Sequence, residues 1–207
     1  MTGRYAALEG IEGAGKSTVA AGVVAVLQAR GRPVLGVREP GGTRTGERVR
    51  RIVLEPEGEV SPWAEALLFA AARSQRAAEL IGPALAAGSW VVGDRSVYSS
   101  LAYQGHGRGL GIDMVRTVNA AGLGGVWPDL VVLLRLDPGL GLERQAVPDR
   151  IGSEGLDLQR KVAEGFDLLA AAEPGRFMVV DAAAPLEAVV DEVATRLEEL
   201  WATSSPV

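Results

Sequence analysis

The chain contains five short apolar segments, each of which ends in a polar or charged residue. They are rich in Val and Leu and cover residues 4–9, 33–38, 89–94, 129–136 and 176–181. Strands that helices cover on both faces show this near-continuous apolar pattern, because neither face meets water. The pattern therefore predicts a buried parallel sheet of five strands.

Helical periodicity follows in the intervals between these segments. In residues 16–30 the apolar positions fall on one helical face: Val19, Val23, Val26 and Leu27. Further helices are expected over residues 62–87, with a break near Gly82-Pro83, over 154–173 and over 185–201. Strands that alternate with helices predict an α/β protein with an open parallel sheet. The glycine-rich stretch 105–111 is expected to be a loop.

Polar side chains stand where four of the predicted strands end. They are Glu9, Arg38, Asp94 and Asp181. Ligands of open α/β sheets bind beyond the carboxyl ends of the strands, so these residues are candidates to face a site.

Length and composition narrow the class of protein. The 207 residues fit one domain, 1–207, and the net charge of −5 gives no overall basic footprint for duplex nucleic acid. Zero cysteines and a single histidine exclude thiolate and multi-histidine metal sites. The N-terminal residues lack the apolar stretch of a signal peptide, and no segment has the apolar length of a membrane span. We expect a cytoplasmic protein without a nucleic-acid or membrane partner.

The segment GIEGAGKS, residues 10–17, matches the phosphate-binding pattern G-x-x-x-x-G-K-[ST] in full. A predicted strand precedes it and a predicted helix follows, so backbone N–H groups and the helix N-terminus can hold a phosphate. Lys16 is expected to reach the β- and γ-phosphates of ATP, and the Ser17 hydroxyl is expected to bind Mg²⁺. The candidate ATP contacts in this loop are Gly10, Ile11, Glu12, Gly13, Ala14, Gly15, Lys16, Ser17 and Thr18.

The rest of the sequence favours a small kinase among nucleotide-binding proteins. The guanine-reading motif N-K-x-D of GTPases is absent, because the only asparagine, Asn119, precedes Ala120. Large motor and remodelling ATPases need a longer chain. We therefore expect the three-layer P-loop kinase fold, with helices on both sides of the five-stranded sheet.

Two arginine-bearing segments are candidates for a second phosphate site. In VREPGGTRTGERVRR, residues 37–51, Arg38 ends a strand and Arg50 lies in an amphipathic helix, although a solvated basic helix face reads the same way. The second segment is VVGDRSVYSSLAYQGHGRG, residues 91–109. In it, Asp94 can hold Mg²⁺ through water and Arg95 can present its guanidinium to a phosphate. The alternative for Asp94 and Arg95 is an ion pair at a helix N-terminus.

Three residues that follow fall on one helical face, at spacings of three and four. They are Ser100, Tyr103 and Gln104, two polar residues and an aromatic that suit a nucleobase and its sugar.

Four segments together resemble bacterial thymidylate kinase, a family of P-loop nucleoside monophosphate kinases. They are GIEGAGKST, REPGGT, LLFAAARSQ and DRSVYSSLAYQGHGRGL, and the resemblance extends from residue 4 to about residue 195. It implies phosphorylation of dTMP to dTDP by ATP and Mg²⁺ in dTTP biosynthesis. It also implies a homodimer, for which the alanine-rich segment 63–87 offers a helix face.

The resemblance implies a role for each matching residue around the acceptor nucleotide. Phe69 would stack on thymine, Arg73 would bond a thymine carbonyl, and Gln104 would read the base edge with Ser100 near it. Tyr103 would pack beneath the deoxyribose, and Glu12 would accept a hydrogen bond from its 3′-hydroxyl. The expected clamps on the monophosphate are Arg38, Arg50 and Arg95.

The resemblance also implies a mobile lid over residues 144–155. Because the phosphate loop holds no arginine, the lid is expected to supply the transition-state cation from Arg150, with Arg144 against the adenine. The expected catalytic residues are thus Lys16, Arg95 and Arg150. This lid departs from the family pattern at Gln145, Ala146, Val147 and Gly152. A surface salt bridge of Arg150 with Asp149 or Glu154 is the plainer interpretation.

Two other functions remain open from the sequence. One is a kinase for a related pyrimidine monophosphate such as dUMP. The other is a nucleotide-binding regulatory protein without catalysis, which the lid departures would suit. Retention of Lys16, Ser17, Asp94 and Arg95 favours the enzyme.

Overall fold

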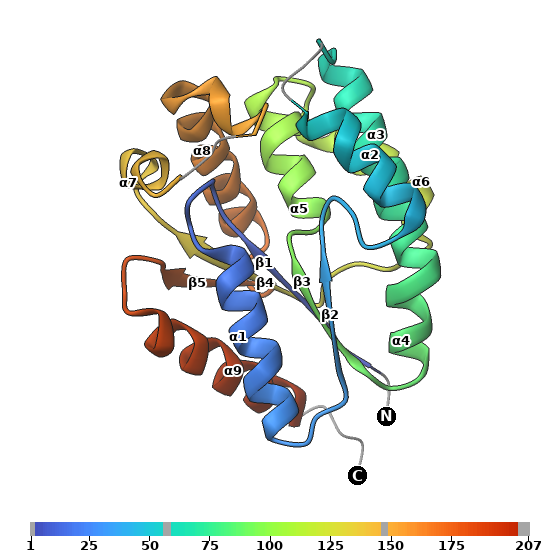
Figure 1. Ribbon diagram of the computed structural model, residues 1–207, viewed down its shortest axis with the longest axis vertical. Helices are drawn as coiled ribbons and strands as arrows, with labels where there is room; N and C mark the ends of the chain where they lie inside the picture. Colours follow the sequence, from blue (N-terminus) through green and yellow to red (C-terminus); the bar gives the residue numbers. More distant parts are fainter. Residues whose placement is uncertain (1–2, 56–58, 146–148, 203–207) are drawn as a thin grey trace.

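Five parallel strands form one sheet in the order β2-β3-β1-β4-β5. The structure is a computed structural model that describes residues 3–55, 59–145 and 149–202 (Figure 1). The strands are β1 (Tyr5–Glu9), β2 (Val34–Arg38), β3 (Trp90–Asp94), β4 (Leu130–Arg135) and β5 (Phe177–Asp181). All five lie within one residue of the limits predicted from the apolar segments, and the parallel α/β fold is confirmed.

The register of the sheet brings three strand ends to the same edge. Asp94 at the end of β3 pairs with Leu8 of β1 on one side and with Arg38 of β2 on the other. Glu9 follows Leu8 directly, so the polar ends of these three strands lie together. A site built there draws on residues that are far apart in the sequence.

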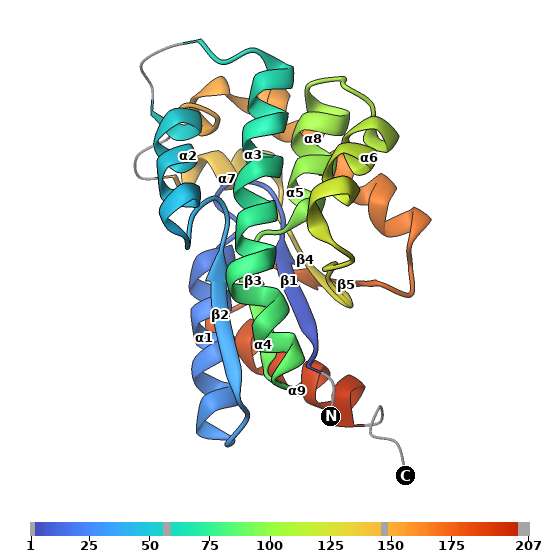
Figure 2. The ribbon, with the colours of Figure 1, turned by 90° about the vertical axis from the view of Figure 1, so that its right-hand side faces the viewer.

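Helices cover both faces of the sheet and give the three layers expected. Helices α1 (Lys16–Ala29) and α9 (Leu186–Ala202) lie side by side on one face. On the other face lie α3 (Pro62–Arg76), α4 (Gly82–Ala86) and α6 (Ile112–Leu123) (Figures 1 and 2). The buried faces of α1 carry the predicted Val19, Val23 and Leu27, whereas Val26 is only partly buried against the core. The other long helices are α2 (Arg44–Leu54), α3 (Pro62–Arg76), α6 (Ile112–Leu123) and α8 (Leu156–Ala172).

The helix break expected near Gly82-Pro83 is wrong, because the chain does not leave the helical conformation there. The chain stays helical from α3 through a π-helical segment, η1 (Ala77–Ile81), into α4 (Gly82–Ala86). Pro83 cannot donate the N–H that would close the preceding α-turn, and a wider turn accommodates this without ending the helix.

The expected loop over residues 105–111 is wrong for its first three residues. Helix α5 (Val97–Ser100) continues as a π-helical segment, η2 (Leu101–Gly107), and only residues 108–111 leave the helix. The glycines there serve close packing, since a Cβ on Gly105 would lie 3.0 Å from Cα of Ile112. Composition alone does not separate such packing glycines from loop glycines.

Two helices had no counterpart in the sequence-based prediction, α6 and the short α7 (Pro138–Glu143). Asp137 caps α7, because its carboxylate accepts hydrogen bonds from the backbone N–H groups of Gly139 and Leu140. The segment between α7 and α8 is the predicted lid; within it the structure describes a 3₁₀ turn, η3 (Gly152–Glu154), while Ala146, Val147 and Pro148 lie outside the described residues.

The hydrophobic core lies between β1, β3 and β4 and the helices on either side. The central strands are almost wholly buried, including Ala6, Leu8, Val92 and Val132. Among the residues that the structure describes, no helix combines the length and apolar character needed to cross a membrane.

Candidate functional site

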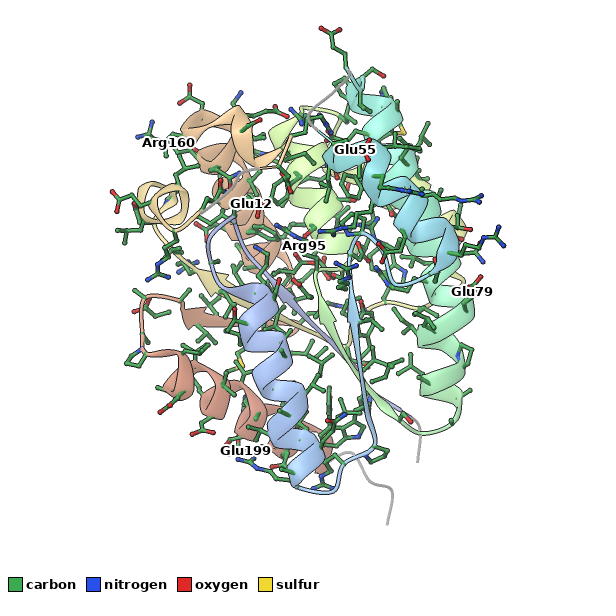
Figure 3. The ribbon with its side chains drawn as sticks, viewed as in Figure 1. Glu12, Glu55, Glu79, Arg95, Arg160 and Glu199 are labelled. Carbon is green, nitrogen blue, oxygen red and sulfur yellow. The ribbon has the colours of Figure 1, made fainter. Side chains whose placement is uncertain are left out.

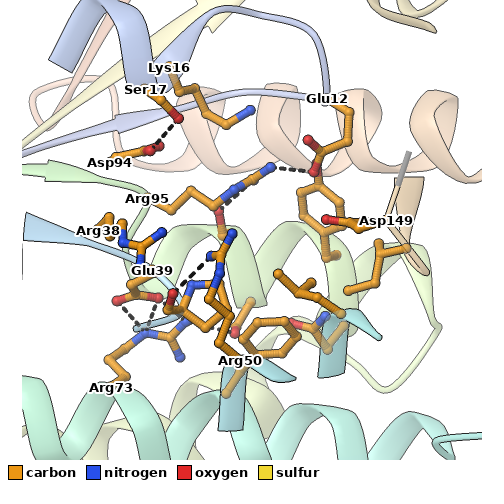
Figure 4. A pocket seen from close by; sticks show the side chains of 18 of the residues that line it. Glu12, Lys16, Ser17, Arg38, Glu39, Arg50, Arg73, Asp94, Arg95 and Asp149 are labelled. Atoms are coloured by element: carbon orange, nitrogen blue, oxygen red, sulfur yellow. Dashed lines mark hydrogen bonds and ion pairs between the residues drawn. The ribbon is translucent and has the colours of Figure 1, made fainter. Parts of the chain in front are cut away.

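A cavity of about 420 Å³ opens at the carboxyl ends of β1, β2 and β3. Figure 4 shows Lys16, Ser17, Asp94 and Glu12 on one side of it and Glu39, Arg50 and Arg73 on the other, with Arg95 between them. Most of the predicted site residues line this one cavity: Glu12, Gly13, Gly15, Lys16, Ser17, Thr18, Arg38, Arg50, Phe69, Arg73, Asp94, Arg95, Ser100, Tyr103 and Gln104.

The phosphate loop connects β1 to the N-terminus of α1, as its sequence predicted. Gly13 has a left-handed backbone with φ 76°, and a Cβ there would lie 2.0 Å from the carbonyl oxygen of Gly141 in α7. Only glycine fits this approach, so α7 packs directly on the loop. Gly10, Ile11 and Ala14 belong to the loop but are not among the residues that line the cavity.

Lys16 is the first residue of α1 and is only 6% exposed. Its Nζ donates a hydrogen bond to the carbonyl oxygen of Ile11, at 2.6 Å. Burial and the nearby Arg95 guanidinium lower its pKa to about 8, while the Glu12 and Asp94 carboxylates act in the opposite direction. The ammonium group thus gains from an anionic ligand, which would replace lost hydration.

Ser17 and Asp94 form the second feature of this end of the cavity. The Ser17 hydroxyl donates to Oδ2 of Asp94 at 2.5 Å, because the pairing of β3 with β1 sets Asp94 beside the loop. A hydroxyl and a carboxylate are hard oxygen ligands, which Mg²⁺ prefers while it keeps several waters and binds phosphate oxygens. This donor set fits Mg²⁺. Within the described ranges there is no cluster of three or more His, Cys, Asp or Glu side chains suited to a metal.

Arg95 follows β3 in a left-handed conformation, with φ 72°, which is unusual for a residue with a side chain. The buried Glu9 carboxylate holds the turn that follows, accepting hydrogen bonds from the backbone N–H of Ser96 and Ser99 and from both hydroxyls. Glu9 therefore lies beneath the site and is not among its lining residues, contrary to the expectation from its strand-end position. Backbone strain held in this way is typical of functional positions.

Asp181 does not line the cavity either. It is exposed at the end of β5, where its carboxylate accepts a hydrogen bond from the Ala183 backbone N–H. Of the four strand-end candidates, Arg38 and Asp94 face the cavity.

Glu12 is paired with Arg95 in the middle of the cavity (Figures 3 and 4). Its Oε1 also accepts a hydrogen bond from the Tyr103 hydroxyl at 3.1 Å, and the Arg95 guanidinium lies 5.2 Å from the centre of the Tyr103 ring. Burial would raise the pKa of Glu12, but Arg95 and Lys16 lower it to about 2. The carboxylate is therefore charged at any ordinary pH and neutralises the Arg95 guanidinium.

Phe69 and Arg73, on one face of α3, line the other end of the cavity. Phe69 is half-buried and packs against the apolar cluster of Val49, Val53 and Ala72, so it serves the core as well as the cavity wall. Arg73 is almost wholly buried and bonds to the Glu39 carboxylate, which also pairs with Arg76.

The hydrogen bonds of Arg73 use most of its donors. Nη1 donates to Oδ1 of Asn119 at 2.5 Å, and Nη2 donates to the Ser100 hydroxyl at 3.0 Å and to the Ser96 carbonyl at 3.3 Å, besides its bond to Glu39. Counted over the described residues, one N–H of Nη1 has no acceptor. Arg73 can thus offer one hydrogen bond to a ligand in the cavity.

The remaining arginines that line the cavity differ in their hydrogen-bond partners. Arg38 is exposed and bonds to Glu47, and Arg50 donates to the carbonyl of Pro40 at 3.0 Å. Arg50 is placed by α2, whose first turn is capped by the Thr43 hydroxyl. Both line the cavity, as Arg95, Arg73 and Lys16 also do.

Arg144 and Arg150 do not line the cavity. Arg144 donates to the carbonyl of Ala182, just after β5. Arg150 bonds to the Glu65 carboxylate and, at 2.9 Å, to the carbonyl of Val53, with Glu154 at 3.8 Å. In this conformation the predicted transition-state cation is held by α2 and α3, away from the phosphate loop.

Sequence reasoning did not identify the carboxylates and amides that hold the arginines. These partners are Glu39, Glu65 and Asn119. Gln159, which accepts the Glu12 backbone N–H at 3.1 Å, was not identified either. Glu39 lies inside the REPGGT segment, so its motif was a usable signal. Asn119 is the only asparagine of the chain, but no spacing connects it to Arg73.

Comparison with known proteins gives a consistent result. The family model described as thymidylate kinase matches residues 8–193. The chain is 48% identical over 206 residues to the thymidylate kinase of Deinococcus radiodurans, covering 98% of this chain and 97% of that protein. It is 45% identical over 205 residues to the thymidylate kinase of Pelotomaculum thermopropionicum, covering 97% of this chain and 95% of that protein.

Proposed function

Because the chain belongs to the thymidylate kinase family, we propose that it transfers the γ-phosphoryl group of ATP to dTMP, giving ADP and dTDP for dTTP biosynthesis. The observation that carries the proposal is one cavity that joins the phosphate loop to a niche lined by Phe69, Arg73 and Gln104. Of the arginines that line it, Arg38, Arg50 and Arg95 lie where the acceptor phosphate would meet the γ-phosphate.

The phosphate loop and Lys16 would bind ATP, and Thr18 and the loop backbone would complete this half of the site. Ser17 and Asp94 would hold Mg²⁺, which neutralises charge on the β- and γ-phosphates when bound. Arg144, beside the Ala182 carbonyl, would pack on the adenine.

The acceptor phosphate would lie among Arg38, Arg50 and Arg95. Three guanidinium groups around a dianion form charge-assisted hydrogen bonds and hold it in line for attack. The acceptor is already an oxyanion, so no general base is needed and catalysis consists of positioning and charge neutralisation. His106 accordingly has no catalytic role in this proposal.

Thymine would stack on Phe69, bond to the free N–H of Arg73 and present its edge to Gln104 and Ser100. The deoxyribose would lie on Tyr103, with its 3′-hydroxyl donating to Glu12. The position of Glu12 supports this role, since its carboxylate lies with Arg95 and Tyr103 of the acceptor half.

Arg150 is proposed as the transition-state cation of the lid, residues 144–155. To reach the phosphates, its guanidinium must exchange the Glu65 carboxylate for the transferring phosphoryl group. A catalytic lid arginine thus requires a closed state that differs from this conformation.

The assembly is proposed to be one kinase domain, 1–207, that pairs as a homodimer through α3 and its neighbours. Trp63 and Leu67 lie one turn apart on α3 and are 39% and 53% exposed, and Ile52 of α2 is 52% exposed. Apolar side chains gathered in this way favour a subunit contact. We place this enzyme in the cytoplasm, with ATP and dTMP as partners and without nucleic acid or membrane.

A coupled assay of ADP release tests the proposed reaction. With ATP and Mg²⁺, each of dTMP, dUMP, UMP, CMP, AMP and GMP is offered as acceptor. We expect the highest kcat/KM with dTMP. A dTMP rate equal to the rate with ATP alone would refute the kinase assignment.

A further inference from the structure

Glu65 of α3 carries a carboxylate that does not line the cavity but bonds to Gln104, which does. Its residue is only 1% exposed, although it stands in the first turn of its helix. A charged side chain buried to this extent requires partners, and the identity of those partners indicates its purpose.

Glu65 receives hydrogen bonds from three side chains on two other segments. Arg108 donates from Nε to Oε1 at 3.1 Å and from Nη2 to Oε2 at 3.0 Å, and Arg150 donates to Oε2. The third donor is the side-chain amide of Gln104, whose Nε2 lies 2.9 Å from Oε1. The carboxylate therefore connects α3, the η2 segment and the lid.

Glu65 remains ionised at neutral pH. Burial alone would raise its pKa, but the hydrogen bonds from Arg108, Arg150 and Gln104 outweigh that effect and hold the pKa below its ordinary value. An ionised carboxylate can only accept hydrogen bonds. The Gln104 amide must then turn Nε2 toward Glu65, because the opposite orientation would set two oxygens against each other.

This orientation fixes what Gln104 offers to a ligand. Gln104 lines the cavity, and its Oε1 receives no hydrogen bond from the part of the chain that the structure describes. Gln104 is only 2% exposed, so little water reaches its Oε1, and this acceptor without a donor favours an N–H from the bound base. Thymine and uracil carry N3–H, whereas N3 of cytosine is a bare acceptor.

We propose that Glu65 is a positioning residue for base selection, which locks the Gln104 amide so that its oxygen faces the cavity. Pyrimidines with N3–H are then accepted, and cytosine is rejected because two acceptors would face each other. This inference rests on the proposed function, since it assumes that Gln104 reads the base edge of a nucleoside monophosphate.

The variant Glu65→Gln tests it with little change of shape. A glutamine at this position can donate as well as accept, so the Gln104 amide becomes free to turn. We expect kcat/KM for dTMP to fall and that for dCMP to rise, so that their ratio falls by about 10- to 100-fold. The dTMP to dUMP ratio should stay constant, because both bases carry N3–H.

Glu154→Gln is the matched control. It removes the other carboxylate bound to Arg108 and near Arg150, but Glu154 does not contact Gln104. The dTMP to dCMP ratio should not change in this variant. An equal fall in Glu154→Gln, or a parallel fall in the dTMP to dUMP ratio, would mean general loosening of the niche and would overturn the inference.

A second measurement does not depend on the stability of Glu65→Gln. In ¹⁵N spectra of the wild-type enzyme, the Gln104 side-chain N–H₂ signal, assigned by its loss in Gln104→Leu, should stay protected and nearly unshifted as dTMP binds. A large shift on binding would show that Nε2 contacts the base, and the inference would fall. Absence of dTMP phosphorylation by the wild type would instead refute the proposed function itself.

Discussion

The donor half and the acceptor half of the cavity are built in different ways. The donor half is almost contiguous in sequence, running from Gly10 to Thr18, and relies on backbone N–H groups, a helix N-terminus and one lysine. The acceptor half takes single side chains from β2, α2, α3, β3 and η2. One half is therefore encoded locally, and the other depends on the packing of the whole fold.

The halves also differ in the partners of their charged side chains. Among the residues that the structure describes, the only hydrogen-bond acceptor of Lys16 Nζ is the backbone carbonyl of Ile11. In the acceptor half and beside it, arginines are paired with carboxylates: Arg95 with Glu12, Arg73 with Glu39, and Arg150 with Glu65. Ligand binding must therefore replace ion pairs in the acceptor half, but must only supply anions in the donor half. This difference predicts distinct kinetic effects.

The largest effect is expected from Lys16→Met, which removes the one side-chain cation of the phosphate loop. We expect kcat to fall by about 10³-fold, because charge on the transferring phosphoryl group loses its fixed partner. The Kd for dTMP should change by less than about 3-fold, since the arginines of the acceptor half remain. Isothermal titration with dTMP and steady-state kinetics measure both. If dTMP affinity fell together with kcat, the two halves would not be independent.

The next largest effect is expected from Arg150→Ala. In this conformation Arg150 forms an ion pair with Glu65. We expect kcat to fall by about 10²-fold, with dTMP affinity nearly unchanged, if Arg150 acts in the transition state. Arg108→Ala, which removes the neighbouring cation on the same carboxylate, serves as the control. Equal losses of kcat in both variants, with lowered melting temperatures, would reduce Arg150 to a structural ion pair.

Phe69→Ala sharpens the comparison at the base end of the acceptor half. A stacked base contributes about 1–3 kcal/mol, so we expect the Kd for dTMP to rise about 5- to 150-fold while the Kd for ATP stays constant. Phe69 also packs against the cluster of Val49, Val53 and Ala72, so thermal unfolding is recorded alongside. A lower melting temperature with unchanged dTMP affinity would leave Phe69 with a core role only.

The sequence predicted the locally encoded features best. The apolar segments gave all five strands to within a residue, and the motif around Lys16 and Ser17 gave the phosphate loop. The position of Asp94 at a strand end gave the partner of Ser17. In the acceptor half, Arg38, Arg50 and Arg95 and the face of Ser100, Tyr103 and Gln104 were candidates from the sequence itself, whereas Phe69 and Arg73 came from the family resemblance. The partners of these side chains were not predicted, because Glu65 meets Gln104 only through the packing of α3 on η2, which no local pattern encodes. The π-helical segments were missed for the same reason.

The smallest effect is a pH dependence that belongs to the donor half alone. Burial and Arg95 lower the pKa of Lys16 to about 8, so its positive charge is lost as the pH rises through that value. Because kcat/KM reports the free enzyme, kcat/KM for ATP should fall about tenfold per unit above that pH. The kcat at saturating ATP should stay flat further into the alkaline range, since bound phosphates raise the pKa again.

Two variants in the cavity should shift the pH at which kcat/KM for ATP begins to fall, in opposite directions. Glu12→Gln removes a negative neighbour that raises the pKa of Lys16, so the fall in kcat/KM for ATP should begin at lower pH. Arg95→Met removes a positive neighbour that lowers it, so the fall should begin at higher pH. Each shift is read from the pH profile, independently of the loss of acceptor binding that both variants cause. If the alkaline fall in kcat/KM began at the same pH in both variants, a group other than Lys16 would cause it. The electrostatic interaction between the two halves would then be negligible.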